Sequence, residues 1–353
     1  MNPKAFAALG LVTVVAVAGA AIALSLQPDY GGTQEAGTKI FPNLMDRVDS
    51  VYGIEVVHPE KTVHVNRQGE GWVIKEADDY PAMTKKVSKT LLDLAQIELY
   101  TPMTRLPDRF EKLWVDDPQK KGGQAKQITL FDKDGKAIAQ AIVGRSKFAV
   151  EGSTTGGVFI RRTNEDQSWL AKGQLDVNYE PRDWLDRAFM ELQANRFKRI
   201  VIRHPGGEEI RISKFDQSAP NYVIENLPAG RQMRSTAEAD DYATTFSGFR
   251  VDDVVSAANK QLPADKTITA DFETFDGLTI KTRLFIEDKV HWVTFEAVTA
   301  PGATASEAAK VDPVKDAELI NQAAKGWVFD VSDYRLSAIK KTMDFMLAEK
   351  TGS

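Results

Sequence analysis

Few side chains in this sequence have the types and spacing that catalysis requires. Glu76, Asp78 and Asp79 form an acidic cluster just before the segment Tyr80-Pro81-Ala82. Neighbouring carboxylates can transfer protons or bind cations. A run of acids at the entry to a helix is more often a solvated loop whose charge complements the helix dipole, and we favour that interpretation.

The histidines offer no metal-binding spacing such as i, i+4, so we expect no zinc site. The chain has four of them, His58, His64, His204 and His291. His58 and His204 each stand directly before a proline at the end of an extended apolar run. A composite site would require these two to face each other across two lobes, and a shared role at a strand end is the simpler interpretation.

Motifs for nucleotides, nucleophilic serine and calcium are absent or incomplete. Gly69-x-Gly71 leads into a strand, and no Lys-Ser or Lys-Thr follows a glycine-rich loop. No Gly-x-Ser-x-Gly elbow occurs. Asp132-x-Asp134-Gly135 resembles the start of a calcium loop, but its later ligands are missing and a hairpin turn explains the same residues. The chain has no cysteine, which excludes disulfides, thiolate metal sites and a lipid-modified cysteine. We therefore predict no catalytic, cofactor-binding or metal-binding residue and no cofactor.

The six tryptophans divide into two groups. Four lie in apolar surroundings and are expected in the core, whereas two could line a groove or simply pack. The core group is Trp72, Trp169, Trp184 and Trp327, and the other pair is Trp114 and Trp292.

Composition is that of an ordinary globular protein. The chain has 353 residues, 42% hydrophobic and 27% charged, with a net charge of −5. This length exceeds what a single hydrophobic core usually supports, so we predict two folded units. Acids and bases are interspersed, so no basic face for nucleic acid is indicated.

An uncharged apolar run over residues 5–26 predicts a transmembrane helix. At 1.5 Å per residue it would be roughly 33 Å long, enough for a hydrocarbon core of about 30 Å. Lys4 precedes it and Asp29 and Glu35 follow, which places residues 1–4 in the cytoplasm and residues 27–353 outside a bacterial-type inner membrane, in the periplasm. Residues 27–45 are expected to be a tether.

A cleaved signal peptide is the alternative, because Ala18-Gly19-Ala20-Ala21 offers small residues to a peptidase. The apolar run continues past these residues to Leu26 and is longer than a typical signal core. We therefore favour the uncleaved anchor.

One pattern of elements occurs twice along the rest of the chain. Each copy opens with an extended apolar run stopped by proline, followed by a second strand, an aromatic strand, a helix and another extended segment. The openings are residues 54–59 and 200–205, the aromatic strands 71–75 and 221–225, the helices 84–94 and 237–249, and the extended segments 97–103 and 251–257.

Each copy then supplies a predicted hairpin. Residues 127–131 and 137–143 flank Asp134-Gly135, and residues 269–275 and 278–286 flank Asp276-Gly277. Asp-Gly between alternating apolar runs is a strong hairpin signal. The fold class predicted is α+β: a single transmembrane helix plus two similar, duplicated lobes of mostly antiparallel sheet with packed helices, over residues 46–190 and 191–353.

Two segments fall outside this scheme. Residues 301–315 are small and polar and are expected to form a surface loop. From Ser332 onward the spacing of Leu336, Ile339, Met343 and Met346 predicts a helix that packs on the second lobe. Docking of that helix onto a partner is the alternative.

A string of short motifs resembles an uncharacterised bacterial family, a domain of unknown function. The motifs are Ile40-Phe41-Pro42-Asn43-Leu44, Gly71-Trp72-Val73, Tyr80-Pro81-Ala82, Gly144, Phe159-Ile160-Arg161-Arg162, Ser168-Trp169-Leu170, Asp183-Trp184-Leu185-Asp186 and, more weakly, Trp327-Val328-Phe329. The resemblance is clearest over residues 40–190. It implies an N-terminal membrane helix and a gene commonly beside ABC-2-type transporter genes of the gliding-motility type. No catalytic residue is implied, and the implied partners are an ABC-2-type permease and its ATPase.

The leading hypothesis is a non-enzymatic accessory subunit of an inner-membrane ABC-type transport system. A tethered periplasmic module that holds a glycan or lipid between its lobes is the second hypothesis. An envelope hydrolase with an unrecognised site is the third.

Overall fold

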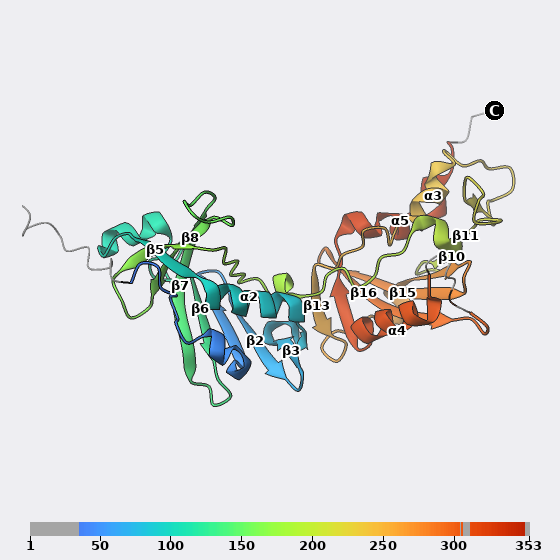
Figure 1. The fold of residues 1–353 in the computed structure, drawn as a ribbon. Helices are drawn as coiled ribbons and strands as arrows, with labels where there is room; N and C mark the ends of the chain where they lie inside the picture. The colour runs from blue at the N-terminus through green and yellow to red at the C-terminus, as the bar shows by residue number, and fades with distance from the viewer. Residues whose placement is uncertain (1–34, 304, 306–310, 350–353) are drawn as a thin grey trace, which may run out of the picture.

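The computed structural model describes residues 35–303, 305 and 311–349, which fold into two lobes side by side (Figure 1). Each lobe is built on one antiparallel sheet. We call the body around the first sheet lobe 1 and the body around the second lobe 2. The predicted transmembrane helix over residues 5–26 lies outside the described residues. Within the part of the chain that is described, no helix is long and apolar enough to cross a membrane.

Lobe 1 contains a sheet of nine strands in the order β4-β3-β2-β1-β6-β7-β8-β9-β5. Every pairing in it is antiparallel. The strands are β1 (Gly53–Val57), β2 (Thr62–Gln68), β3 (Gly71–Ile74), β4 (Tyr80–Pro81), β5 (Glu98–Pro102), β6 (Lys126–Phe131), β7 (Ala137–Lys147), β8 (Gly157–Arg162) and β9 (Ser168–Lys172).

Lobe 2 contains eight strands in the order β12-β11-β10-β14-β15-β16-β17-β13, and these pairings are antiparallel too. The strands are β10 (Phe197–Arg203), β11 (Glu209–Ser213), β12 (Val223–Ile224), β13 (Asp253–Ser256), β14 (Ile268–Thr274), β15 (Leu278–Glu287), β16 (Val290–Thr299) and β17 (Trp327–Asp330).

The two sheets share one connectivity. If β4 is set aside, the order in lobe 1 is β3-β2-β1-β6-β7-β8-β9-β5, and the order in lobe 2 is β12-β11-β10-β14-β15-β16-β17-β13. The two orders correspond strand by strand, and each ends on the strand that follows the helix of its lobe, β5 or β13. The predicted mixture of helix and antiparallel sheet is therefore confirmed, and both predicted hairpins form, as β6–β7 and β14–β15.

The helices differ more between the lobes than the strands do. The predicted helix of lobe 1 is α2 (Thr84–Gln96), which buries Val87, Leu91 and Leu94 against the sheet. Its counterpart in lobe 2, α3 (Ala237–Ala243), is much shorter. Short 3₁₀ turns complete the fold: η1 (Met45–Ser50), η2 (Lys75–Ala77), η3 (Pro107–Leu113), η4 (Pro181–Trp184), η5 (Ala194–Arg196) and η6 (Ala264–Lys266).

The prediction of a loop over residues 301–315 is wrong at its end. Helix α4 (Pro313–Ala324) begins there and packs across β15 and β16. The Asp312 side chain accepts hydrogen bonds from the backbone N–H groups of Val314 and Lys315, and Pro313 occupies the first turn. An N-cap aspartate followed by proline is a strong helix start.

The predicted continuous C-terminal helix is also wrong. It is broken into η7 (Asp333–Leu336), α5 (Ser337–Lys340) and α6 (Met343–Met346). Lys341 leaves the helix because its backbone and side chain are both held by lobe 2: its carbonyl lies 3.1 Å from His204 Nε2, and its ammonium donates to Glu238 and Asp241. The predicted packing on lobe 2 is nevertheless confirmed, since the apolar stripe is buried: Leu336, Ile339, Met343 and Met346.

Candidate functional site

The acidic cluster does not form a carboxylate pair. Glu76 turns back onto β2, where its two oxygens accept from the backbone N–H of His64 at 2.8 Å and contact His64 Nδ1 at 2.6 Å. Asp78 points to lobe 2 and accepts from the Ser256 N–H at 2.8 Å and from Asn259 Nδ2 at 2.9 Å. These carboxylates therefore hold structural hydrogen bonds, and Asp78 belongs to the junction between the lobes.

The two equivalent histidines contact different partners. The buried His58 ring stacks on Tyr179 with centroids 3.7 Å apart, and burial lowers the pKa of His58. His204 contacts the Lys341 carbonyl in lobe 2. Each histidine opens the turn between the first two strands of its lobe, as the strand-end interpretation expects.

The calcium-like motif is a hairpin turn. Asp132 Oδ1 accepts from the backbone N–H groups of Asp134 at 3.0 Å and Lys136 at 2.9 Å. Gly135 takes the left-handed φ of +76° that this turn requires. Across the described ranges, no group of three histidine or acidic residues is placed to hold a metal ion.

The tryptophans follow their predicted groups with one exception. Trp72, Trp169 and Trp184 are buried in the core, whereas Trp327 is only partly buried and lies where the lobes meet. Trp114 ends η3 in lobe 1 and Trp292 lies on β16 in lobe 2 beneath the Lys260 ammonium, so they do not share a groove.

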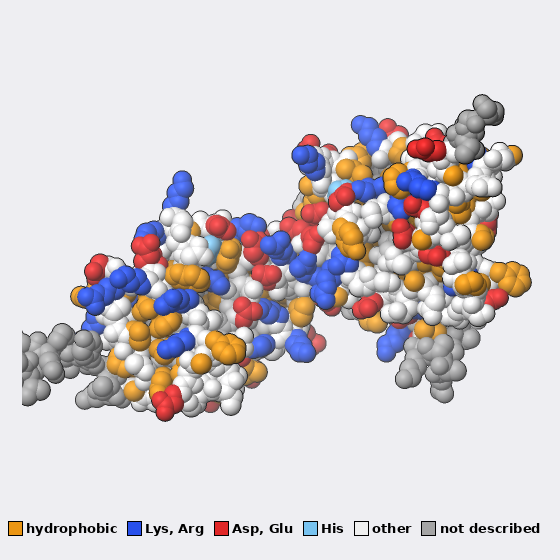
Figure 2. All heavy atoms as spheres, turned by 90° about the horizontal axis from the view of Figure 1, so that it is seen from above, with side chains coloured by type: hydrophobic (Ala, Val, Ile, Leu, Met, Phe, Trp, Pro, Cys, Tyr) orange, Lys and Arg blue, Asp and Glu red, His pale blue; other side chains and the backbone are white. Residues whose placement is uncertain are grey.

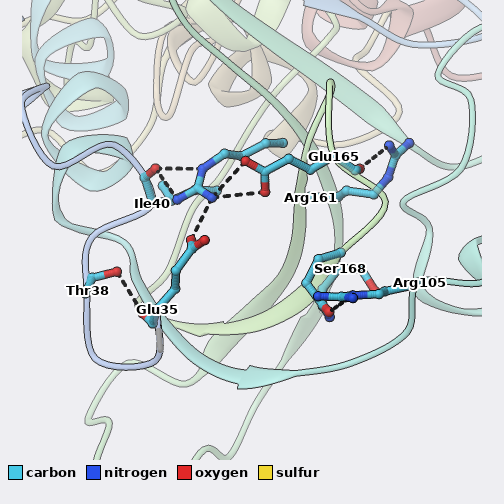
Figure 3. A network of polar contacts seen from close by, with 9 residues as sticks. Glu35, Thr38, Ile40, Arg105, Arg161, Glu165 and Ser168 are labelled. Carbon is cyan, nitrogen blue, oxygen red and sulfur yellow. Dashed lines mark hydrogen bonds and ion pairs between the residues drawn. The ribbon is translucent and has the colours of Figure 1, made fainter. Parts of the chain in front are cut away.

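Two consecutive arginines on β8, Arg161 and Arg162, hold different segments against the first sheet. Figure 3 shows Glu35, Ile40 and Glu165 gathered around one guanidinium, with Arg161 beside Glu165. Side chains alternate along a strand, so neighbours point to different sides. Arg162 reaches the segment that enters lobe 1: its Nε and Nη2 donate to the Ile40 carbonyl at 3.0 and 2.9 Å, and its Nη1 donates to Glu35 at 2.8 Å. Glu165 accepts from the same Nη1 at 3.0 Å. Burial alone would lower the pKa of Arg162, but the bonds to Glu35 and Glu165 outweigh it and raise the pKa, so this guanidinium stays charged.

We call this arrangement the entry clamp: Arg162 with Glu35, Ile40 and Glu165. Backbone pairing reinforces it, because the Gly37 N–H donates to the Leu99 carbonyl of β5 at 2.7 Å. The first described residues are thus hydrogen-bonded to the edge strand of lobe 1.

Arg161 serves the other face of the sheet. Its Nε donates to the Val115 carbonyl at 3.1 Å, and its guanidinium lies over the Phe110 ring, 4.6 Å from the centroid. Nearby, the Ser168 hydroxyl donates to the Thr104 carbonyl at 2.6 Å. The motif residues Arg161, Arg162 and Ser168 therefore hold the segments around β8 and β9 in place. In the sequence these residues stand out only as members of short motifs. The alternation of side chains along a strand that ends in two arginines is the signal that could have indicated their roles.

The lobes are joined by specific contacts as well as by the chain. Arg187, in the linker, donates to the Val251 carbonyl at 2.7 Å and to Asp252 at 2.5 Å. Tyr80 of β4 donates its hydroxyl to the Ala323 carbonyl of α4 at 3.1 Å, and its ring meets Trp327 edge to face at 4.9 Å. Burial, with a smaller contribution from Asp186, raises the pKa of Tyr80, so its hydroxyl remains a donor.

A cleft of about 490 Å³ opens beside these contacts. Lobe 1 and the linker supply one wall and α4 of lobe 2 supplies the other. The lining is largely apolar, with a few polar groups: Tyr80, Pro81, Ala82, Met83, Thr84, Asp186, Ala188, Phe189, Leu319, Gln322 and Ala323. Such a surface can hold a small apolar group with one or two oriented polar contacts. The motif Tyr80-Pro81-Ala82 lies here, next to Asp186 from a second motif.

Comparison with known proteins gives one match. Neither the curated proteins nor the solved structures contain a match to this chain. A family model covers residues 72–269, more than half of the chain, from β3 of lobe 1 to β14 of lobe 2. The family's unit therefore crosses the junction between the lobes. The chain belongs to the uncharacterised family described as Domain of unknown function (DUF4340).

Proposed function

We propose that this protein is a non-enzymatic, membrane-anchored accessory subunit of an ABC-type transport system, with its two lobes in the periplasm. The partners proposed are an ABC-2-type permease and its ATPase, which the motif resemblance implies. The observation that carries the proposal is the entry clamp. A chain that only needed to be retained near a membrane could leave its tether free, whereas here the tether end is held by a charged side chain and by strand pairing.

The clamp gives the anchor mechanical consequences. Residues 35–40 are held on β5 and by Arg162 of β8, and lobe 1 is joined to lobe 2 through Asp78, Tyr80 and Arg187. A displacement of the membrane segment would then move lobe 1, and lobe 1 would carry lobe 2 with it. This is what a subunit that responds to a moving permease requires.

Replacing the anchor tests this proposal. The native chain and a version whose residues 1–26 are exchanged for a cleavable signal peptide would each be expressed in a strain that lacks the gene. We expect the native chain to fractionate with the inner membrane and to restore the phenotype of the deletion. The soluble version should be stable but inactive, and full activity of that version would contradict the proposal.

A second candidate function, a ligand-binding module, is supported by the cleft at the junction. The lining favours a ligand with an apolar portion, such as a lipid acyl chain or the flat face of a sugar. Titration with a fluorescent fatty acid and with oligosaccharides, followed by anisotropy, would test it. Leu319→Arg is a suitable blocking variant because this side chain is 51% exposed and lines the cleft, so the helix should tolerate the change. Binding that survives Leu319→Arg would place the ligand elsewhere.

A further inference from the structure

The outer face of the first sheet carries a second, smaller apolar cluster. It is separate from the main core and is covered by η3 and by the loop between β7 and β8, residues 148–156. The cluster consists of Phe110, Leu113, Val115, Ala125, Ile142, Val150, Phe159 and Leu170. η3 crosses this face closely, since a Cβ on Gly144 of β7 would lie 2.2 Å from the Leu113 carbonyl oxygen. The covering segments are thus firmly seated.

Besides the side chains that they bury in the cluster, these covering segments expose other large apolar side chains. Phe148, at the start of the loop, is 99% exposed, and Leu106 and Trp114 at the two ends of η3 are 48% and 41% exposed. Seen from above, lobe 1 shows hydrophobic side chains with basic and acidic ones between them (Figure 2). Large apolar groups presented together on seated segments indicate a surface with an interaction partner.

Cations accompany these apolar groups. The stretch from Gly144 to the end of the loop at Gly156 contains two basic residues, Arg145 and Lys147, and one acid, Glu151, in a chain whose net charge is −5. Arg145 lies over the Phe159 ring at 5.3 Å, and Lys172 lies over the Tyr100 ring at 4.1 Å. These two rings belong to the smaller cluster, so the cations lie at the surface above it. Basic residues close to exposed aromatic side chains such as Phe148 and Trp114 are the pattern by which proteins bind an anionic membrane surface.

The position of the loop relative to the chain entry agrees with such a partner. Lys172 of β9 pairs in register with Glu98 of β5, and Glu98 forms a bridge with Lys39 of the entering segment. The Lys172 side chain also lies beside Gly152 of the loop. The entering segment and the loop therefore meet at the same edge of lobe 1. In the sequence, the entering segment follows the apolar run at residues 5–26.

We propose that this surface, formed by Leu106, Trp114, Arg145, Lys147 and Phe148, docks on the headgroup region of the bilayer with Phe148 inserted at the interface. The inference rests on the membrane anchor of the proposed function. A hollow of about 940 Å³ lies beside Phe148 and is lined by Lys147, Glu151 and the hydroxyls of Ser146, Ser153, Thr154 and Thr155. Lys147 and the hydroxyls can bind a headgroup phosphate, and Glu151 can accept from an ethanolamine ammonium. Docking would hold lobe 1 against the membrane while lobe 2 extends beyond it.

The absence of cysteine makes a direct test possible. Phe148→Cys and Phe215→Cys give single-cysteine versions of the full chain, and the second is a matched control because Phe215 is 95% exposed in lobe 2. Each is labelled with an environment-sensitive dye and reconstituted in vesicles of phosphatidylethanolamine with phosphatidylglycerol, or of phosphatidylcholine alone. We expect a blue shift and quenching by a lipid-attached quencher at position 148 in the anionic vesicles, and neither at position 215.

Charge removal sharpens the test. Arg145→Gln combined with Lys147→Gln should lower the ratio of docked to undocked lobe 1 about 30-fold, since each basic residue near an anionic surface contributes about 1 kcal/mol. Equal, water-like emission at positions 148 and 215 in a chain that floats with the vesicles would overturn the docking inference and leave the anchor intact. A chain that does not float with vesicles would instead refute the anchor itself.

Discussion

Replacing Arg162 by alanine should release residues 35–40 from lobe 1 without unfolding the sheet. The side chain is partly buried and extends from the end of β8, and its contacts run mainly to the entering segment. No core side chain is shortened by the substitution. The effect should therefore be local.

The size of the effect follows from which contacts are shielded from water. Glu35 and Glu165 are 48% and 41% exposed, and exposed ion pairs contribute about 0–1 kcal/mol. The Ile40 carbonyl belongs to a buried residue and accepts from two guanidinium nitrogens, and bonds to charged groups contribute about 1.5–3 kcal/mol. We expect opening of the entry clamp to become easier by about 2–3 kcal/mol in total, most of it from Ile40. The open population should rise about 30- to 150-fold.

Amide hydrogen exchange can measure this change residue by residue. The Gly37 and Ile40 N–H groups donate to the Leu99 and Ile97 carbonyls, and they exchange only when the segment opens. Both should exchange about 30- to 150-fold faster in Arg162→Ala, while the midpoint of global unfolding changes little.

Arg161→Ala is the matched control, because its side chain donates to the Val115 and Glu165 backbone carbonyls and to no group of residues 35–40. It should accelerate exchange at Val115, in the segment that Arg161 holds, and leave Gly37 and Ile40 unchanged. Unchanged exchange at Gly37 and Ile40 in Arg162→Ala would refute the clamp, and so would equal acceleration by both variants.

Three further changes test other parts of the structure. Arg196→Met should destabilise lobe 2 by about 3 kcal/mol in urea unfolding, because it leaves Asp276 half-buried without its cation. Burial acts to raise the pKa of Asp276, but the bonds from Arg196 outweigh it and hold the pKa below its usual range. The wild type should therefore lose this stabilisation below about pH 4, and the variant should show a flatter dependence of stability on pH in acid. Asp78→Ala leaves the Ser256 N–H without its partner and should broaden the distribution of distances between fluorophores placed on the two lobes. Burial lowers the pKa of His58, so native stability should fall as the pH drops below about 6.5, and His58→Phe should remove that component of the slope while keeping the ring stack.

The parts of the fold that depend on neighbouring residues could be predicted. Asp134-Gly135 and Asp276-Gly277 produced hairpins because turn chemistry and strand alternation act over a few residues. The stripe Val87, Leu91 and Leu94 identified α2 for the same reason. The start of α4 also had a local signal, the N-cap Asp312 followed by Pro313. The polar composition of residues 301–315 led to the prediction of a loop instead.

The parts that depend on distant residues could not. Lys341 would continue a helix by its local pattern, yet contacts with His204 and Glu238 pull it out. Trp327 is as apolar as the core tryptophans, and only the position of Tyr80 across the junction shows that it lies between lobes. Such contacts depend on the assembled topology and leave no local pattern to read.

For the candidate site, too, local patterns could be predicted and long-range contacts could not. The motifs were recognisable in the sequence, but the contacts that their residues make were not. Arg162 and Ile40 belong to separate motifs far apart in the chain, and the hydrogen bonds between them emerge only when β8 and the entering segment lie on one sheet. The acidic cluster shows the converse. Glu76 and Asp78 are only two positions apart in the sequence, yet they bind different elements.

The most direct test of the proposed function is purification of the full chain from native membranes in mild detergent, with the tag at Ser353. We expect a permease and an ATPase to be recovered with it in a fixed ratio. Arg162→Ala should reduce the amount of permease and ATPase recovered, and Arg161→Ala should not. Repeated recovery of the chain alone, even after crosslinking in cells, would contradict the transporter-subunit function and leave the cleft between the lobes as the site to pursue.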